Sequence, residues 1–211
     1  MTLLYFARHG ETDDNARLVF QGQTGKGLNA RGRAQARRLA ERMHKSRVTS
    51  IFTSDLERAV ETSLIVGAAC GVEPGMDPDL REVDVGLWSG KSHQEIRELY
   101  PEEWAAWSNG LDLRRGGGET YAELAARIER AVARICAADA RDPVLVVSHG
   151  GAIKSYVSKI LGVSAEGMRA LAGVGNAGLT IIERDDRGRM RLHAWNDTAH
   201  LEGLLAIEQT D

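Results

Sequence analysis

The stretch that decides the fold is Leu3-Leu4-Tyr5-Phe6-Ala7-Arg8-His9-Gly10-Glu11-Thr12, close to the start of the chain. Its first five residues are apolar, and a run of this length predicts a buried strand. Arg8 and His9 then stand at the carboxyl end of that strand, where open α/β sheets bind their ligands. A guanidinium beside an imidazole suits a phosphoryl group that is attacked by nitrogen. The motif therefore indicates phosphoryl transfer, with a solvated strand end as the alternative.

A second histidine repeats this arrangement later in the chain. Val144-Leu145-Val146-Val147 predicts a central strand that is buried on both faces, and Ser148-His149-Gly150-Gly151 follows it directly. Parallel strands bring their carboxyl ends to the same edge of a sheet, so we expect His9 and His149 to share one site. The glycines of the second motif allow the backbone to approach a ligand closely.

The rest of the chain alternates between strand and helix patterns, which predicts one α/β domain over residues 1–211. Further strands are expected at 50–53, 179–184 and 190–195, and helices at 29–43, 54–69, 92–100, 102–107, 119–138 and after Gly151. Ser54 and Glu57 form a capping-box signature for a helix that Gly71 ends. The Gly-rich loop at 21–28 and residues 74–90 predict irregular structure.

Composition and charge argue against several classes of partner. The net charge is -3, and the basic residues form neither a stripe nor a polybasic tail, so we expect no nucleic-acid or membrane partner. The N-terminus lacks the longer apolar core of a signal peptide, and no apolar run reaches membrane-spanning length. Cys70 and Cys136 lie in Ala-rich helical stretches and predict buried thiols rather than a disulfide. We therefore expect a cytoplasmic protein.

Arg58 is predicted to lie near the N-terminus of a helix, where a positive charge is unfavourable. The capping-box signature places it in or just after the first turn of the helix at 54–69, where the positive end of the helix dipole disfavours a cation. A bound anion would account for this placement. An ion pair with Glu57 or Glu61 on a solvated face is the alternative, and the presence of Arg8 favours the anion.

Glu82 and Asp84 alternate with two valines, a pattern typical of the wet face of a half-buried strand. We keep this interpretation for Asp84. Phosphoryl transfer to nitrogen also needs a proton for the departing alkoxide, and a carboxyl group held partly protonated by nearby phosphate charge can supply it. Glu82 is our candidate for this general acid.

With these residues in place, the chain resembles the histidine phosphatase superfamily, in the branch that contains the cofactor-dependent phosphoglycerate mutases and their phosphatase relatives. The resemblance covers nearly the whole chain. It rests on motifs in a fixed order, namely Arg8-His9-Gly10-Glu11-Thr12 with Asn15, Gln21-Gly22, Ser54-Asp55-Leu56-Glu57-Arg58-Ala59 with Thr62, Arg81-Glu82, Gly86-Leu87-Trp88-Ser89-Gly90, Gly117-Gly118-Glu119-Thr120, Ser148-His149-Gly150-Gly151 and Asn196-Asp197-Thr198-Ala199-His200-Leu201.

The resemblance implies a single three-layer α/β/α domain with a mostly parallel central sheet. It implies that His9 is the nucleophile and becomes a phosphohistidine that water hydrolyses, with Glu82 as the general acid and without a metal ion or other cofactor. The phosphoryl and substrate contacts that it implies are Arg8, Asn15, Gln21, Gly22, Arg58, His149 and Gly150. We also expect a backbone carbonyl on the second nitrogen of His9, which would fix its neutral tautomer.

The expected substrate is a small phosphorylated metabolite, and the expected acceptor is water. Mutases of this branch are usually longer and carry Tyr-Gly-x-Leu-x-Gly-Leu-Asn-Lys where this chain has Val85-Gly86-Leu87-Trp88-Ser89-Gly90-Lys91. They also have a tryptophan directly before the asparagine, where this chain has Asp14. These departures favour a phosphatase over a mutase. A phosphoprotein-directed or regulatory binding protein is a further alternative, although the complete set of site residues gives no support to an inactive pocket. A homodimer is left open.

Arg114 and Arg115 lie in the segment where family members build the lid that selects substrate. They could reach a carboxylate or a second phosphate, and a solvated loop is the alternative. Of Trp88, Trp104 and Trp107, we expect at least two to pack in the core rather than line the cleft. The remaining histidines have no compact metal-ligand spacing, which argues against a metallohydrolase: His44, His93, His193 and His200.

Overall fold

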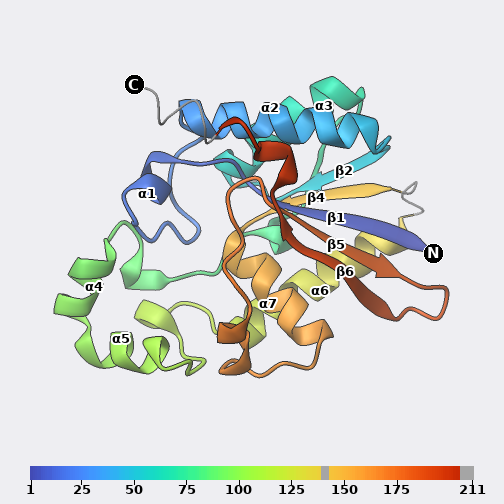
Figure 1. Cartoon of the computed structure of the whole chain (residues 1–211). Coiled ribbons are helices and arrows are strands. Elements are labelled where there is room, and N and C mark those ends of the chain that lie inside the picture. The colour runs from blue at the N-terminus through green and yellow to red at the C-terminus, as the bar shows by residue number, and fades with distance from the viewer. Residues whose placement is uncertain (139–142, 205–211) are drawn as a thin grey trace.

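The computed structural model describes residues 1–138 and 143–204. Within them a six-stranded sheet has helices packed on both of its faces (Figure 1). The strands are β1 (Thr2–Arg8), β2 (Ser50–Thr53), β3 (Gly75–Met76), β4 (Val144–Ser148), β5 (Leu179–Arg184) and β6 (Met190–Asp197). Their order across the sheet is β3-β2-β4-β1-β5-β6; β5 is antiparallel to both β1 and β6, and the pairs among the first four strands of this order are parallel. The predicted three-layer fold with a mostly parallel sheet is confirmed.

Two pairs of helices form the outer layers. The helices α2 and α3 cover one face of the sheet, and α6 and α7 cover the other (Figure 1). The smaller helices α1, α4 and α5 lie at the end of the sheet where β1 ends, on the left in Figure 1. The bounds are α1 (Asp13–Ala16), α2 (Ala30–Lys45), α3 (Glu57–Cys70), α4 (His93–Leu99), α5 (Pro101–Ser108), α6 (Tyr121–Ala137) and α7 (Gly150–Ile160). Short 3-10 turns span Pro78–Leu80, Gly86–Trp88, Arg115–Gly117, Gly167–Ala170 and Ala199–Leu201.

The register of the central strands brings the two histidine motifs together. In the parallel pair of β1 and β4, Arg8 lies opposite Ser148. The strand β2 is parallel to β4 on its other side, so Ser54 also leaves the sheet at this edge. The next residues of the two motifs, His9 and His149, therefore stand side by side, as the repeated strand-histidine-glycine pattern predicts.

The core has two parts because side chains alternate across the sheet. Leu4, Phe6 and Val146 pack with the apolar stripes of α6 and α7. Ala7 and Val147 point to the other side and pack with α2 and α3. All five residues of β4 are buried, which confirms the prediction of a central strand covered on both faces.

The predicted capping box at Ser54 is wrong. The helix α3 begins at Glu57, its N-cap is Leu56, and no side chain caps it. The hydroxyl of Ser54 instead accepts a hydrogen bond from the backbone N–H of Leu56 at 3.2 Å and lies 2.8 Å from Nε2 of His149. The side chain of Ser54 therefore contacts His149 at the edge of the sheet and does not cap α3. Gly71 does end α3, in the left-handed region with φ of 69°.

Two short elements differ from the expectations. The helix α1 was not predicted, although Thr12 and Asn15 form a reciprocal capping box at its start. The two-residue strand β3 was also missed. Residues 81–85 are irregular, as predicted for 74–90, so Asp84 does not lie on a strand, although the two valines are buried as the alternation suggested. Cys70 and Cys136 are free thiols, as expected, but each is only partly buried.

Candidate active site

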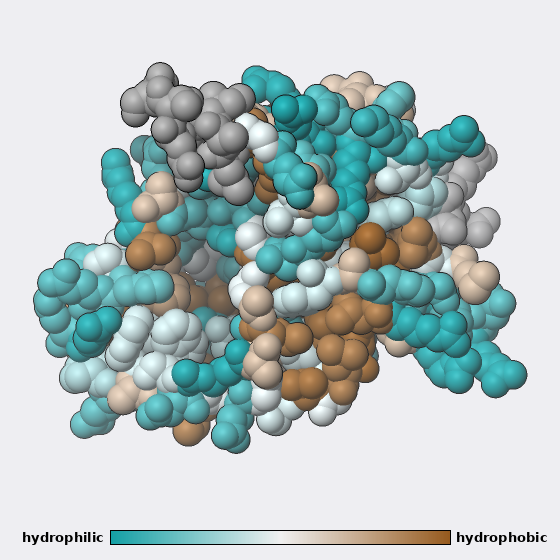
Figure 2. All heavy atoms as spheres, in the orientation of Figure 1, coloured by the Kyte–Doolittle hydropathy of each residue, from teal (hydrophilic) through white to brown (hydrophobic). Residues whose placement is uncertain are grey.

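A cavity of about 360 Å³ lies at the carboxyl edge of the sheet. Its walls come from the ends of the strands and from the segment that carries α4 and α5, where Figure 2 shows a hollow in the surface. Most of the residues that the sequence assigned to substrate or catalysis line it, namely Arg8, His9, Asn15, Gln21, Gly22, Arg58 and Glu82. Two do not: His149 lies behind the wall, and Gly151 rather than Gly150 reaches the cavity.

His9 is held as a neutral imidazole. It follows β1 directly and is only 2 % exposed. Its Nδ1 lies 2.7 Å from the carbonyl oxygen of Gly10, which fixes the proton on that nitrogen and leaves the lone pair on Nε2. Burial, and then the charges of Arg58 and Arg8, hold the pKa of His9 well below its usual range. The expected backbone carbonyl on the second nitrogen is therefore present.

Arg58 is the second residue of α3, and its guanidinium points to the cavity rather than to the helix surface. Its Nε donates to Nε2 of His9 at 3.2 Å, and its Nη2 and Nη1 donate to the carbonyl oxygens of Gly22 and Thr24. Burial lowers the pKa of Arg58 to about 10, which still leaves it a cation at neutral pH. Within the described part of the chain, the alternative of an ion pair between Arg58 and Glu57 or Glu61 is not found, and Glu61 binds the guanidinium of Arg33 instead.

Arg8 is the second cation of the cavity. Its Nη1 donates to the carbonyl oxygen of Val174 at 2.7 Å, while its Nε is buried without a hydrogen-bond partner in the described part of the chain. Burial lowers the pKa of Arg8, opposed by the charge of Glu82. A partly buried guanidinium whose Nε–H has no partner in the described part of the chain is suited to bind an anion.

Glu82 lies in the segment before the 3-10 turn at Gly86–Trp88, and the start of α7 positions its carboxylate. One oxygen, Oε1, accepts the backbone N–H groups of Val83 and Ala152, at 2.9 and 3.0 Å. The other, Oε2, accepts the N–H of Gly151 at 3.0 Å. A β-carbon at position 151 would stand 2.5 Å from Oε1, so only glycine leaves room for the carboxylate.

His149 is fully buried next to His9, with 5.2 Å between the ring centres. Its Nε2 lies 2.8 Å from the hydroxyl of Ser54, and its Nδ1 has no hydrogen-bond partner among the described residues. Burial, and then the charge of Arg58, keep the pKa of His149 well below its usual range. Both histidines are therefore neutral in the folded protein.

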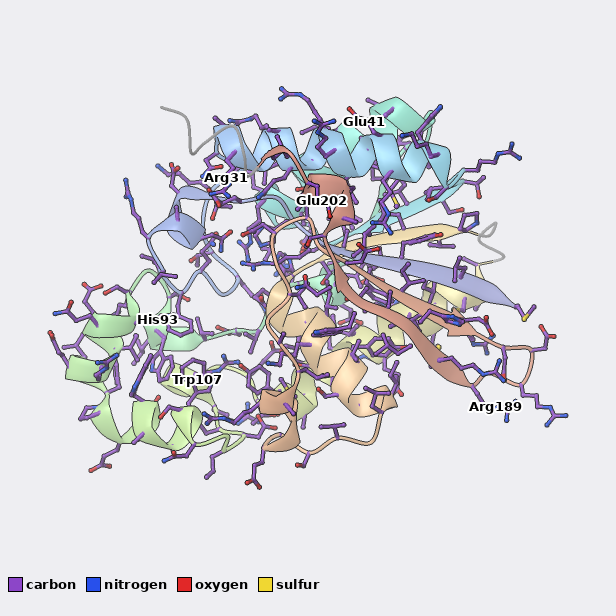
Figure 3. The ribbon with its side chains drawn as sticks, in the orientation of Figure 1. Arg31, Glu41, His93, Trp107, Arg189 and Glu202 are labelled. Atoms are coloured by element: carbon purple, nitrogen blue, oxygen red, sulfur yellow. The ribbon has the colours of Figure 1, made fainter. Side chains whose placement is uncertain are left out.

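The structure adds residues that the sequence did not reveal. The amide Nδ2 of Asn176, in the loop before β5, donates to the carbonyl oxygen of His9 and to Oδ1 of Asn15, both at 3.1 Å. The only sequence signal was the glycine-rich loop at 173–178. Phe20, His93 and Tyr121 also line the cavity, together with Arg115 and Trp107, which the sequence had raised as lid or cleft candidates. Figure 3 labels His93 and Trp107 on α4 and α5.

Other candidates lie away from the cavity. His200 contacts Arg42 and the carbonyl oxygen of Ala177, and His44 stands near the end of α3 on the surface. Trp88 is buried in the core, as expected for at least two of the three tryptophans, and Trp104 packs against the same core. Arg114 points outward to Glu123.

The described residues form neither a metal site nor a membrane span. Among residues 1–138 and 143–204, no three His, Cys, Asp or Glu side chains stand close enough to hold a metal ion. In the same part of the chain, every helix is too short or too polar to cross a membrane.

The fold and the cavity define the class of protein as an α/β protein with an arginine- and histidine-lined cavity at the carboxyl edge of its sheet. The sequence model of the histidine phosphatase superfamily (branch 1) matches residues 4–198. The chain belongs to this superfamily. The predicted family is thus confirmed, and with it the predicted class of enzyme, a phosphatase.

Named relatives include both phosphatases and a mutase. The "Probable phosphoglycerate mutase GpmB" of Enterobacter sp. (strain 638) is 39 % identical over 81 % of this chain and 80 % of its own. The "Metal-independent phosphoserine phosphatase" of Arabidopsis thaliana is 32 % identical over 99 % of this chain and 87 % of its own. The solved structure of mycobacterial glucosyl-3-phosphoglycerate phosphatase with VO3 is 34 % identical, with a TM-score of 0.85, and the match covers 93 % of this chain and 99 % of that one.

Proposed function

We propose that the protein hydrolyses the phosphomonoester of a small phosphorylated metabolite through a phosphohistidine on His9, without a metal ion. One observation carries the proposal. The imidazole is neutral, its Nδ1 is tied to a carbonyl oxygen, and its Nε2 lies beside the guanidinium of Arg58 at a cavity. An unprotonated nitrogen next to an arginine is the arrangement that nucleophilic attack on a bound phosphoryl group needs.

In the first half of the reaction, Arg8 and Arg58 hold the phosphoryl oxygens and Nε2 of His9 attacks phosphorus. The P–O bond to the alcohol breaks as the N–P bond forms, and charge spreads over oxygens that the arginines face. No proton has to leave Nε2 of His9, because that nitrogen is unprotonated; the hydrogen bond that it accepts from Nε of Arg58 is given up as the N–P bond forms. The second neutral histidine, His149, packs behind His9 and limits the movement of its ring.

Glu82 delivers the proton that the departing alkoxide needs. The backbone N–H groups of Val83, Gly151 and Ala152 hold the carboxylate at the cavity wall. In the second half, Glu82 takes a proton from the water that attacks the phosphohistidine, which releases inorganic phosphate and restores the site.

A phosphoglycerate mutase is the second candidate, and the name of the Enterobacter relative supports it. In a mutase, another hydroxyl of the bound molecule takes the phosphoryl group instead of water. The departures at Asp14 and Val85–Lys91 from the mutase pattern favour the phosphatase. The phosphatase names of the plant and mycobacterial relatives agree with this choice.

The test is phosphate release from a panel of small phosphomonoesters with a chelator present, and with the His9→Ala protein run beside the wild type. We expect chelator-resistant release by the wild type and none by His9→Ala, while inorganic phosphate still binds to the variant. Interconversion of 3-phosphoglycerate and 2-phosphoglycerate is measured in parallel. Isomerisation faster than phosphate release would favour the mutase, and turnover by His9→Ala would refute the nucleophile.

Location and assembly are further proposals. The free thiols Cys70 and Cys136 favour a reducing compartment such as the cytoplasm, and the net charge of -3 opposes a nucleic-acid partner. The strand β6 stands at an edge of the sheet, where a second copy could add a strand to form a homodimer. Analytical ultracentrifugation of the purified protein distinguishes the homodimer from a monomer.

A further inference from the structure

The loop before β5 holds the main chain that carries His9. The backbone N–H of Ala177 donates to the carbonyl oxygens of Arg8 and His9, at 3.1 and 3.2 Å. The preceding residue, Asn176, donates through Nδ2 to the same oxygen of His9 at 3.1 Å. Two N–H donors of this loop therefore converge on the carbonyl oxygen of the proposed nucleophile, so a shift of the loop would move the main chain of His9.

Ala177 has a backbone conformation that its own side chain disfavours. Its φ is 55°, in the left-handed region where the β-carbon of an L-residue comes too close to a carbonyl oxygen, and the residue is fully buried. A strained conformation of this kind persists only where the surrounding structure imposes it. The position of Ala177 therefore depends on contacts that come from outside the loop.

His200 supplies such a contact from the other end of the chain. It lies in the 3-10 turn Ala199–Leu201, which packs beside α2 (Figure 1). Its Nε2 lies 3.0 Å from the carbonyl oxygen of Ala177, and its Nδ1 lies 3.3 Å from Nη1 of Arg42 on α2. His200 thus connects α2 to the loop that holds His9.

The two partners of His200 select one tautomer of its ring. A guanidinium can only donate, so Nδ1 must accept, and a carbonyl oxygen can only accept, so Nε2 must carry the proton. Burial, and then the charge of Arg42, lower the pKa of His200, which favours this neutral ring. Nη2 of Arg42 also donates to Asp197, which holds the guanidinium in place. The hydrogen bonds from Asp197 through Arg42 and His200 to Ala177 are therefore matched donor to acceptor at every step.

We propose that His200 is a positioning residue for the reaction at His9, which fixes the main chain of the nucleophile through Ala177 although it lies away from the cavity. The inference rests on the proposed function, in which Nε2 of His9 attacks phosphorus. Attack requires close alignment of the reacting atoms, and a misplacement of about 1 Å can cost about 100-fold in rate. Glu82 is held separately, by the N–H groups of Val83 and of the first turn of α7, so delivery of the proton to the leaving group is not expected to change.

The experiment compares His200→Leu, which removes both ring nitrogens, with His200→Gln, whose amide can donate to the same carbonyl oxygen. In His200→Leu we expect kcat to fall by about 10- to 100-fold, and by the same factor on an alkyl phosphate and on nitrophenyl phosphate, because both esters need attack by His9. The inhibition constant of inorganic phosphate is expected to change less than about 3-fold, because Arg8 and Arg58 remain. His200→Gln is expected to bring kcat back to within about 3-fold of the wild type.

His44→Leu is the matched control, because it removes a similar contact on the surface, between Nδ1 of His44 and the carbonyl oxygen of Ala69 at 3.0 Å. It is expected to leave kcat unchanged, and thermal melts show that each variant is folded. A His200→Leu protein with the kcat of the wild type would overturn the proposal, as would an equal loss in His44→Leu or a His200→Gln protein no faster than His200→Leu.

A second comparison covers the case in which His200→Leu does not fold. His200→Asn, whose amide is one bond shorter than that of glutamine, then takes its place beside His200→Gln. Faster turnover by the glutamine variant supports the contact with Ala177, and equal rates overturn it. Turnover by His9→Ala would instead refute the proposed function, whatever the His200 variants show.

Discussion

Replacement of Gly151 by alanine should displace the general acid while leaving the fold intact. The new β-carbon would stand 2.5 Å from Oε1 of Glu82 and 3.2 Å from its carboxyl carbon. Such a contact cannot exist, so the carboxylate must move by about 0.9 Å to reach an ordinary contact distance of about 3.4 Å. The helix itself is not harmed, because alanine favours a helix over glycine by up to about 1 kcal/mol.

The size of the effect follows from the hydrogen bonds at that carboxylate. Glu82 accepts three backbone N–H groups, two of them from the first turn of α7. Loss of one hydrogen bond to a charged group costs about 1.5–3 kcal/mol. If the transition state relies on this placement, kcat/KM falls by roughly 10- to 150-fold. The loss should be large for esters with a poor leaving group and small for nitrophenyl phosphate, which needs no proton from the enzyme.

Gly150→Ala is the matched control for this prediction. A β-carbon there would lie 3.5 Å from Cδ and Nε of Arg8, which is ordinary van der Waals contact. Both variants are assayed on an alkyl phosphate and on nitrophenyl phosphate, with a thermal melt to show that each is folded. A Gly151→Ala protein that matches Gly150→Ala on the alkyl ester would refute the reasoning about Glu82.

Three further predictions concern the same site. Glu82→Gln should slow alkyl esters far more than nitrophenyl phosphate in steady-state kinetics, and equal losses on both would contradict the acid role. Ser54→Ala should lower the free energy of unfolding by about 1–3 kcal/mol in urea titrations, because it removes the 2.8 Å partner of the buried His149; an unchanged midpoint would show that this contact is dispensable. Stability should also fall as the pH drops below about 6.5. The folded pKa values of His9 and His149 are well below 6.5, so the unfolded chain binds more protons there. Each histidine contributes a slope of at most about 1.4 kcal/mol per pH unit, measured by urea unfolding at successive pH values, and stability that rises on acidification would contradict it.

The sequence alone determined the parts of the fold that local pattern encodes. The apolar runs of β1 and β4 fixed two buried strands, because a side-chain period and a length are enough to define them. The histidine that follows each run was predicted to lie at the same edge of the sheet, because parallel strands bring their carboxyl ends to one edge. The helices after Thr120 and Ser92 were also predicted, and both have the capping boxes that local residues can form.

Only the tertiary structure decided which side chains meet. Ser54 was predicted to cap a helix, but its hydroxyl instead contacts His149, which lies 95 residues further along the chain. Asn176 reaches the backbone of His9 from 167 residues away, a contact that no local pattern signals. Local pattern also does not distinguish Arg114 from Arg115. The two are adjacent in sequence, yet Arg114 faces solvent and Arg115 faces the cavity. These contacts depend on which segments pack against each other and on which polar groups are left without partners. Neither can be read from the spacing of residues along the chain.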